Sequence, residues 1–444
     1  MNEPIINIGI TTNPEIAFEL YGDFISSSDG IRLSGGFHAK YNNNRIIIKR
    51  NGEDFFSGGE ISFEPRELET ESFLLKDVVI GKNFHWERTE NQRFRGSLKL
   101  IIEGEKLTAV NRIPIEEYLT SVVSSEMNAN SSLELLKAHA IISRGWLLAQ
   151  LEKKKLNKTQ KSLNEFITED EIIRWYDLED HDKYDFCADD HCQRYQGVAK
   201  IINDNALSAV QSTYGLALKY DGSICDTRYS KCCGGMSESF ENVWEPVKHN
   251  YLAPIVDYKF ELDGIDYDLT NERSATKWIS SMPHAYCNTN DAKILSQILQ
   301  DYDQSTNNFF RWKVEYTQDE ISSLVKNKTG IDFGSILDLI PIERGYSGRL
   351  IKLKIIGTNK TLTIGKELEI RKTLSATHLY SSAFYITKQD ISENIPGRFI
   401  LHGAGWGHGV GLCQIGAAVM GERGYKFDEM LLHYFKGAKI QKIY

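Results

Sequence analysis

The chain has 444 residues, of which 41% are hydrophobic and 25% charged, and its formal net charge is −9. This length suits two or three domain-sized units, or one large core with insertions, in an ordinary globular protein. The acidic balance argues against a nucleic-acid partner, because phosphate binding favours a basic face. No apolar run approaches the ~18 residues of a membrane-spanning helix, so no transmembrane segment is expected.

The N-terminal segment MNEPIINIGITTNPEIAFEL carries early acidic residues and no basic region before a long apolar run, so no secretory signal is expected in the sequence as written. Seven cysteines is an odd number for so long a chain. This count favours free thiols or metal ligands over a disulfide framework.

Residues 1 to about 112 consist of short alternating or β-branched runs separated by Gly, Asn and Asp turns, which predict antiparallel strands. These runs are INIGI, EIAFEL, GIRLSGGF, RIIIKR, SLKLIIEG and KLTAV. The last two form a predicted hairpin that leads into a helix at Pro114.

Helices are predicted over about 115–128 and about 132–152. Ser131 and Glu134 have the spacing of a capping box at the start of the second helix. Further strands are expected within 193–220, near 224–230, and from residue 312 onward in WKVEYT, LIKLKIIG and KTLTIG.

Charged and polar residues dominate two segments, about 152–184 and 262–310, which we interpret as insertions. The first contains a short helical patch at EDEIIRWYDL, and the second contains helical pieces. A glycine-rich segment then opens into a last helix near 413–424. The predicted class is α+β, with a β-rich body, a two-helix segment, charged insertions and a C-terminal helix after a glycine-rich loop.

The first predicted helix carries a candidate catalytic acid. Tyr118, Val122 and Glu126 are four residues apart and share one helix face. A carboxylate that ends an apolar stripe is costly to ionise, so its pKa tends to rise, as a general acid requires at neutral pH. From spacing alone, a glutamate turned to solvent or paired with a lysine is the favoured alternative.

The stretch HDKYDFCADDHCQRY contains His181, Cys187, His191 and Cys192, a ligand composition that Zn²⁺ favours. Because His191 and Cys192 are adjacent, at most three of the four are expected to bind one ion, which leaves one histidine free for chemistry. Reduced thiols packed in a core fit the composition equally well.

Two further segments have open interpretations. Cys232 and Cys233, before two glycines, could act as a thiol nucleophile, but buried thiols in a tight turn are the preferred interpretation, as they are for Cys225. The segment HGAGWGHGVGLCQIGA lacks the phosphate-loop pattern. A loop that brings backbone amides, one histidine and Gln414 against a ligand is its functional interpretation.

Seven ordered blocks, spanning roughly residues 95 to 437, together resemble the SpoIID/LytB family of stage II sporulation proteins D and amidase enhancers. They are VNRIPIEEYLTSVVSSEM, LLKAHAIISRGW, CADDHCQRYQG, RYSKCCGGMSESFENVW, ERGYSGRL, EIRKTLSATHLYSSAFYI and HGAGWGHGVGLCQIGAAVMGERGYKFDEMLLHYF. The expected domains are therefore a β-rich region over residues 1–90 and a SpoIID-like catalytic domain over 91–444 that contains both insertions.

The resemblance implies a lytic transglycosylase that cleaves peptidoglycan glycan strands, particularly strands without stem peptides. Glu126 matches the position of the family's single catalytic acid, which reverses the preference drawn from spacing. Glycoside hydrolases usually need two carboxylates. A lytic transglycosylase needs one, because the sugar's own 6-hydroxyl replaces water and leaves a 1,6-anhydro-muramyl end.

Other roles also follow from the resemblance. Arg144 and His191 are expected to orient the substrate and to stabilise charge in the transition state, with a zinc ion held by His181, Cys187 and Cys192. Four further residues are expected to bind substrate, namely Tyr229, Ser230, His408 and Gln414. The sequence departs from the family at His139 and Gly145, where Gln and Thr are common, and at Lys231-Cys232, where small residues are usual.

The expected partners are peptidoglycan strands or muropeptide fragments and a cell-wall amidase. A non-catalytic glycan-binding amidase enhancer is the main alternative, and a cysteine peptidase ranks well behind it. This substrate indicates a compartment outside the cytoplasmic membrane. Because no export signal is visible, either a leader was removed or the protein acts on glycan fragments in the cytoplasm, which the thiols favour.

Overall fold

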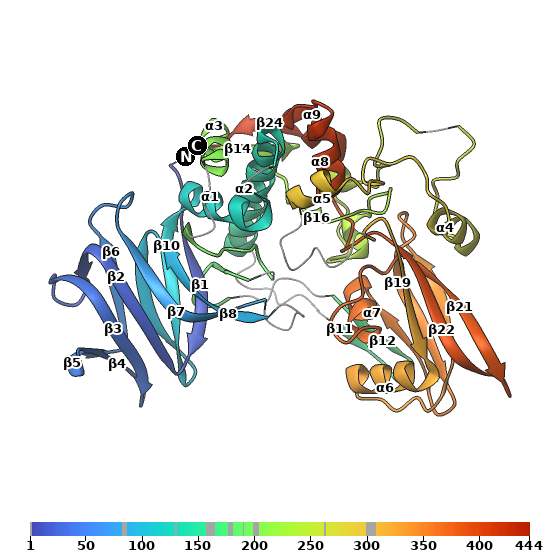
Figure 1. The fold of residues 1–444 in the computed structure, drawn as a ribbon, viewed down its shortest axis with the longest axis horizontal. Coiled ribbons are helices and arrows are strands. Elements are labelled where there is room, and N and C mark those ends of the chain that lie inside the picture. Colours follow the sequence, from blue (N-terminus) through green and yellow to red (C-terminus); the bar gives the residue numbers. More distant parts are fainter. Residues whose placement is uncertain are drawn as a thin grey trace. The chain divides into compact units, whose positions relative to one another are not determined.

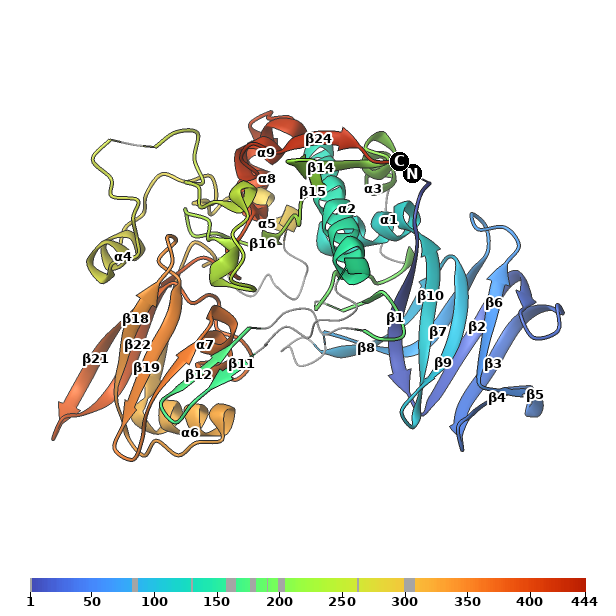
Figure 2. The same cartoon turned by 180° about the vertical axis from the view of Figure 1, so that it is seen from behind.

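The computed structural model describes residues 2–81, 87–128, 131–156, 165–175, 181–189, 191–198, 204–261, 263–298 and 308–444 (Figures 1 and 2). By its internal contacts the chain divides into two compact units. The first comprises Met1–Arg144, Leu178–Ala217 and Lys442–Tyr444, and the second comprises Gly145–Asp177 and Leu218–Gln441. The mixture of helices and sheets confirms the α+β class. None of the helices in the described ranges is long and apolar enough to cross a membrane.

An 11-stranded sheet forms the body of the first unit, in the order β13-β1-β10-β9-β6-β2-β3-β4-β5, with β7 pairing with β2 and β8. Its strands are β1 (Ile5–Asn13), β2 (Glu15–Ser26), β3 (Arg32–Asn42), β4 (Arg45–Arg50), β5 (Glu53–Gly58), β6 (Glu60–Pro65), β7 (Ser72–Ile80), β8 (Arg88–Phe94), β9 (Ser97–Glu103), β10 (Lys106–Pro114) and β13 (Phe186–Cys187). The six runs predicted as strands all lie in this sheet.

Alternating burial explains why these runs form strands. In β2, the side chains of Ile16, Phe18 and Leu20 are buried and the residues between them are less so, as expected for a strand with one face on a core. The ring of Phe18 lies 5.3 Å from that of Phe37 and 5.2 Å from that of Phe63, which come from β3 and β6. The sheet continues past residue 90, whereas the expected domain boundary falls inside β8.

The helices of the first unit follow the sheet. α1 (Ile115–Glu126) begins directly after Pro114, as predicted, and α2 (Leu133–Leu156) follows it and continues into the second unit. Ser132, one residue after the predicted cap, accepts a hydrogen bond from the backbone N of Leu135 at 3.3 Å. α3 (Asn205–Ser212) occupies a region predicted as strand, while much of the run GVAKII lies outside the described residues.

The second unit contains two larger sheets. β11 (Glu165–Ile167), β12 (Glu171–Arg174), β20 (Thr361–Gly365), β19 (Leu350–Gly357) and β18 (Ile336–Arg344) form one, in that order. The other has the order β17 (Arg311–Thr317), β22 (Ile395–Ala404) and β21 (Phe384–Ser392). The helical patch expected at EDEIIRWYDL is wrong, because Ile172 and Ile173 pair with β20 as part of β12.

The remaining elements are short and lie wholly or mostly in the second unit. They are β14 (Leu216–Tyr220), β15 (Ser223–Ile224), β16 (Tyr229–Ser230), η2 (Phe240–Asn242), η3 (Asn250–Leu252), α4 (Glu272–Ile279), α5 (Ala292–Ile298), α6 (Gln318–Thr329), α7 (Glu367–Thr373), β23 (Leu412–Cys413), α8 (Gln414–Glu422), α9 (Phe427–Tyr434) and β24 (Lys439–Lys442). α8 confirms the helix predicted after the glycine-rich segment, but α9 follows it, so α8 is not the last helix. Parts of both expected insertions lie outside the described residues.

Candidate functional site

Glu126 is the last residue of α1, and its position follows from how that helix packs. Tyr118 and Val122 are fully buried, and the chain turns to extended backbone at Met127. The Glu126 side chain is half-buried, and its Oε1 accepts a hydrogen bond from the backbone N of Arg194 at 3.1 Å. The carboxylate is therefore held against the segment that follows Cys192. A raised pKa for this group stays a prediction.

The segment after Cys192 is itself fixed along α1. Tyr195 packs its ring 4.7 Å from the ring of Tyr118 and donates a hydrogen bond to Asn111 Oδ1 at 2.7 Å. Ser121 donates to the carbonyl of Gly197 at 2.9 Å. These contacts bury polar groups with their partners satisfied, so the backbone N that meets Glu126 has a defined place.

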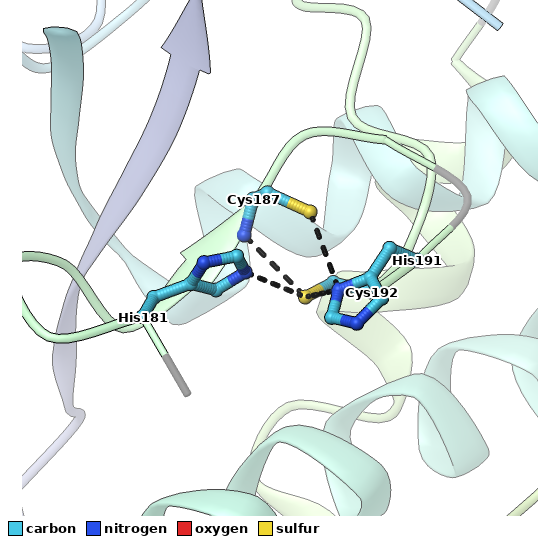
Figure 3. Close-up of side chains that lie close together, drawn as sticks. All are labelled: His181, Cys187, His191 and Cys192. Carbon is cyan, nitrogen blue, oxygen red and sulfur yellow. Dashed lines mark hydrogen bonds between the residues drawn. The ribbon is translucent and has the colours of Figure 1, made fainter. Parts of the chain in front are cut away.

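The Cys and His residues ahead of this segment form one compact cluster (Figure 3). The possible ligand atoms of His181, Cys187, His191 and Cys192 all lie within 4.8 Å of one another. The Cys192 Sγ lies 3.7 Å from Nε2 of His181 and 3.6 Å from Nδ1 of His191. The expectation that adjacency keeps His191 or Cys192 away is wrong, because the turn after β13 lets both side chains face the same point.

Two thiols and two imidazoles are a common ligand set for tetrahedral zinc. Hydrogen bonding by Cys192, and then by His181 and His191, lowers the pKa of the Cys187 thiol against the opposing effect of burial. The thiolate is the form that binds metal. The residues present therefore fit zinc, and His191, expected to act on substrate, lies among the possible ligands.

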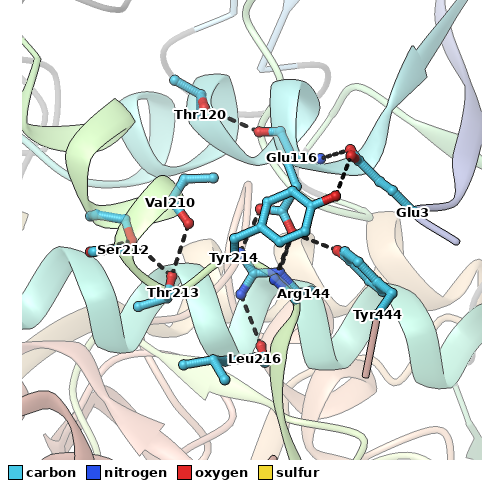
Figure 4. A network of polar contacts seen from close by, with 12 residues as sticks. Glu3, Glu116, Thr120, Arg144, Val210, Ser212, Thr213, Tyr214, Leu216 and Tyr444 are labelled. Carbon is cyan, nitrogen blue, oxygen red and sulfur yellow. Dashed lines mark hydrogen bonds and ion pairs between the residues drawn. The ribbon is translucent and has the colours of Figure 1, made fainter. Parts of the chain in front are cut away.

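Arg144 lies in a buried polar network (Figure 4). Its guanidinium is fully buried and donates from Nε and Nη2 to the two carboxylate oxygens of Glu116 at 2.8 and 2.6 Å. Its Nη1 donates to the carbonyl of Leu216 at 2.9 Å. Glu116 also accepts from the Gly215 backbone N and from the Tyr444 hydroxyl. The geometry supports a role in stability for Arg144, and its expected catalytic role stays a prediction.

The four expected substrate-binding residues come together within the second unit. Parallel pairing of β16 with β23 places Tyr229 and Ser230 beside the two residues that precede Gln414. The Ser230 hydroxyl is buried without a hydrogen-bond partner among the described residues. The imidazole of His408 lies 4.6 Å from the ring of Trp244, at a steep angle.

His408 is held as a neutral imidazole. Its Nδ1 accepts a hydrogen bond from the backbone N of Val410 at 3.0 Å. Burial lowers its pKa well below the usual value, the positive charge of Arg228 acts in the same direction, and a hydrogen bond with the backbone of Tyr229 opposes both. A neutral ring can donate or accept a hydrogen bond at neutral pH without introducing a charge.

The glycine-rich loop is fastened by a residue that had no predicted role. Arg349 is 1% exposed and donates from Nε and Nη2 to the carbonyl of Gly407 at 3.2 and 3.1 Å. Its Nη1 donates to the carbonyl of Cys233 and to Ser347 Oγ. Ser347 in turn donates to the buried carboxylate of Glu238 at 2.5 Å. The run ERGYSGRL thus joins the loop to the segment around Cys233.

Comparison with known proteins gives two family matches. Residues 103–220 match the model of the stage II sporulation protein family, SpoIID, and residues 238–411 match a domain of unknown function, DUF8618. The first match contains Glu126, Arg144 and the whole Cys and His cluster. The chain therefore contains a SpoIID domain over residues 103–220, and its similarity to proteins named amidase enhancer and stage II sporulation protein D supports membership of the SpoIID/LytB family.

The related proteins are distant in sequence. It is 26% identical to an uncharacterized protein of Brachyspira hyodysenteriae, over 78% of this chain and 72% of the relative. It is 24% identical to an amidase enhancer of Bacillus subtilis, over 72% of this chain but only 40% of that protein. A stage II sporulation protein D of Bacillus amyloliquefaciens is 21% identical, over 75% of this chain and 76% of the relative.

Two contacts could not be predicted from the sequence. Glu116 lies in the segment VNRIPIEEYLTSVVSSEM, but 28 positions along the chain separate it from Arg144, and no helical or strand spacing links them. Arg349 lies in the segment ERGYSGRL, and only the folded chain brings it to Gly407. Repeated Gly and Arg in ERGYSGRL were the one available signal of a tightly packed turn.

Gly411 should not tolerate a side chain. Its φ is +74°, and an added Cβ would stand 2.1 Å from the backbone O of Arg228, which already accepts from Leu412. We expect Gly411→Ala to cost about 2–4 kcal/mol of unfolding free energy, from left-handed strain and overpacking together. Urea unfolding measures this value. Gly424→Ala, with φ +86° and nothing within 4 Å, is the matched control and should cost only about 1 kcal/mol. Equal losses would contradict the steric argument.

His139 should make the protein sensitive to acid. It is 1% exposed, and burial lowers its pKa to about 3. The unfolded chain binds a proton below about pH 6.5 while the folded chain does not, so stability falls as pH decreases through that range. At pH 5 this loss amounts to about 2 kcal/mol.

The variant His139→Gln tests this linkage. Urea unfolding of both proteins at pH 7.5 and pH 5 should give a loss on acidification that is smaller in the variant by about 2 kcal/mol. Other titrating groups, including the Cys and His cluster, are common to both proteins and cancel in the difference. An identical pH dependence would refute the assignment to His139.

Proposed function

We propose that this SpoIID protein is a lytic transglycosylase that cleaves peptidoglycan glycan strands, preferentially strands without stem peptides. The observation that carries the proposal is the placement of Glu126. Its carboxylate is half-buried at the end of a rigid helix and is oriented by the backbone N of Arg194. A single carboxylate held in this way is the group that a one-acid cleavage requires.

The proposed reaction uses Glu126 twice. In its protonated form, Glu126 gives its proton to the glycosidic oxygen as the bond from that oxygen to the muramyl C1 breaks. The resulting carboxylate takes the proton of the C6 hydroxyl of the same sugar, and that oxygen bonds to C1. The products are a free hydroxyl on one fragment and a 1,6-anhydro-muramyl end on the other, with Glu126 reprotonated and no water consumed.

The Cys and His cluster supports the proposed role of Glu126. A zinc ion held by His181, Cys187, His191 and Cys192 would supply a rigid cross-link within the segment. Cys192 is two residues from Arg194, whose backbone N contacts the Glu126 carboxylate. The cluster therefore adjoins the segment that orients the proposed acid, and we assign it the role of positioning the Glu126 carboxylate.

The second unit offers groups suited to a sugar. His408 is neutral, Ser230 has a hydroxyl without a protein partner in the described part of the chain, and Trp244 presents an aromatic ring beside His408. Sugars are bound through hydroxyl hydrogen bonds and stacking on aromatic faces. We propose that Tyr229, Ser230, His408 and Gln414 contact glycan.

The product of the reaction provides the test. Purified protein is incubated with glycan strands freed of stem peptides, and mass spectrometry searches for anhydro-muramyl ends. Such ends support the proposal. Their absence, while the protein still pellets with insoluble peptidoglycan, would remove the enzymatic role and leave only binding.

A second candidate is a glycan-binding protein that stimulates an amidase, favoured by the 24% identity to an amidase enhancer. The chain spans 40% of that protein, so other parts of the enhancer have no counterpart in the match. Release of stem peptides by a purified cell-wall amidase, with and without this protein, tests it. Stimulation would support the candidate, and an unchanged amidase rate would exclude it.

A further inference from the structure

A second group of possible metal ligands lies wholly within the second unit, apart from the Cys and His cluster. It consists of Cys233, Asp257, Cys287 and Cys413. Four separate stretches of chain contribute one residue each, so no local spacing in the sequence marks the group. Its members are between 0% and 3% exposed, and all three cysteines are free thiols.

The dimensions of the group match a single tetrahedral ion. With Zn–S bonds of about 2.3 Å, tetrahedral sulfur atoms stand about 3.8 Å apart, and no two ligands of one ion can be more than about 4.6 Å apart. The Sγ atoms of Cys233 and Cys287 are 3.6 Å apart, and all four ligand atoms lie within 4.8 Å of one another. A sulfur separation of 3.6 Å is too long for a disulfide bond.

The carboxylate of Asp257 is an expensive group to bury. It is 0% exposed and forms no ion pair among the described residues. Its oxygens accept hydrogen bonds from the Tyr434 hydroxyl at 2.6 Å and from the backbone N of Cys287 at 2.9 Å. Neutral donors compensate a buried charge only in part. A divalent cation would offset the cost of keeping this carboxylate ionised.

The surroundings hold the four side chains in place. The Cys413 Sγ accepts a hydrogen bond from the backbone N of Cys233 at 3.2 Å. Gly416, inside α8, allows a close approach, because a Cβ there would stand 2.5 Å from Asp257 and 2.3 Å from the Tyr434 hydroxyl. Partners that orient ligands in this way are typical of metal sites.

We propose that Cys233, Asp257, Cys287 and Cys413 bind one structural Zn²⁺ ion in the second unit. Three thiolates and one carboxylate are ligands that zinc accepts, and four protein ligands leave no open position for catalysis. Arg311, whose guanidinium donates to the carbonyls of Gly234, Trp278 and Ser281, adds a positive charge near the thiolates. The ion ties β23 and the start of α8 to the loops that carry Asp257 and Cys287.

Metal content tests the proposal independently of glycan cleavage. The variant Cys187→Ser/Cys192→Ser removes two ligands of the first cluster, so zinc that remains after purification belongs to the second group. Elemental analysis should find one zinc per chain in this variant. Adding Cys287→Ser or Asp257→Asn should abolish that zinc, whereas Cys225→Ser, at a buried cysteine outside the group, should retain it.

If a ligand variant fails to fold, its zinc content cannot be interpreted. A second measurement therefore uses only the parent protein, Cys187→Ser/Cys192→Ser. Grown with Co²⁺, it should show thiolate-to-cobalt charge transfer and the visible bands of a tetrahedral ion. The absence of zinc and cobalt from the parent, an equal zinc content after Cys287→Ser, or a disulfide between Cys233 and Cys287 in the intact mass would each overturn the proposal.

Discussion

Replacing Glu126 with Gln should lower the rate of glycan cleavage by at least about a hundredfold, because one carboxyl group serves as both acid and base in the proposed reaction. Glutamine has the same shape but neither gives nor takes a proton at neutral pH. The measurement is the formation of anhydro-muramyl ends per unit time by the variant and by the wild-type protein under the same conditions.

The same substitution should leave the fold intact. The Glu126 carboxylate accepts a hydrogen bond from the backbone N of Arg194, and the amide oxygen of Gln can accept that hydrogen bond equally well. The side chain is only half-buried, so replacing the carboxylate with a neutral amide of the same shape should cost little stability. Binding to peptide-free glycan and the urea midpoint should both stay close to wild type.

The matched control is Glu117→Gln on the same helix. Glu117 pairs with Arg95 at 3.2 Å, and both side chains are partly exposed. This variant should cleave glycan at the wild-type rate, which separates loss of the acid from a general loss of charge on α1. Full activity in Glu126→Gln would refute the proposed acid, and unfolding of that variant would show that Glu126 is structural.

Local patterns predicted the elements that arise from local chemistry. Alternating runs gave the strands of the N-terminal sheet, and an apolar stripe after Pro114 gave α1. Patterns failed where long-range pairing decides the outcome. Ile172 and Ile173 sit in a stretch with helical spacing but form a strand, because β20 supplies the hydrogen bonds. Such a partner, nearly 200 positions away, leaves no trace in the local pattern.

The candidate site shows the same difference between features set by local sequence and features set by long-range contacts. Residues close in sequence, such as Cys187 and Cys192, could be recognised together, and the error over His191 came from treating a turn as if it kept neighbouring side chains apart. The second group of possible metal ligands could not be recognised from the sequence, because Asp257 and Cys287 come close to Cys413 only in the folded chain. Buried charge is likewise a property of the folded chain, as Arg144 shows.

Replacing Glu116 with Gln should destabilise the first unit by about 3–5 kcal/mol, because it leaves the buried guanidinium of Arg144 without a counter-charge. The amide oxygen can keep the contacts of one carboxylate oxygen. The amide NH₂ would then face Nη2 of Arg144, which puts two donors opposite each other. Urea unfolding of wild type and variant at neutral pH measures the loss.

Glu117→Gln again supplies the comparison, since it changes the neighbouring residue in the same way. Its pair with Arg95 is partly exposed, so its loss should cost no more than about 1 kcal/mol. If the two variants unfold at the same urea concentration, the Glu116–Arg144 pair does not carry the stability assigned to it. Arg144 would then be available for the electrostatic role expected from the family. A large difference instead makes Arg144 a structural cation, whose loss lowers activity only through the fraction of protein that stays folded.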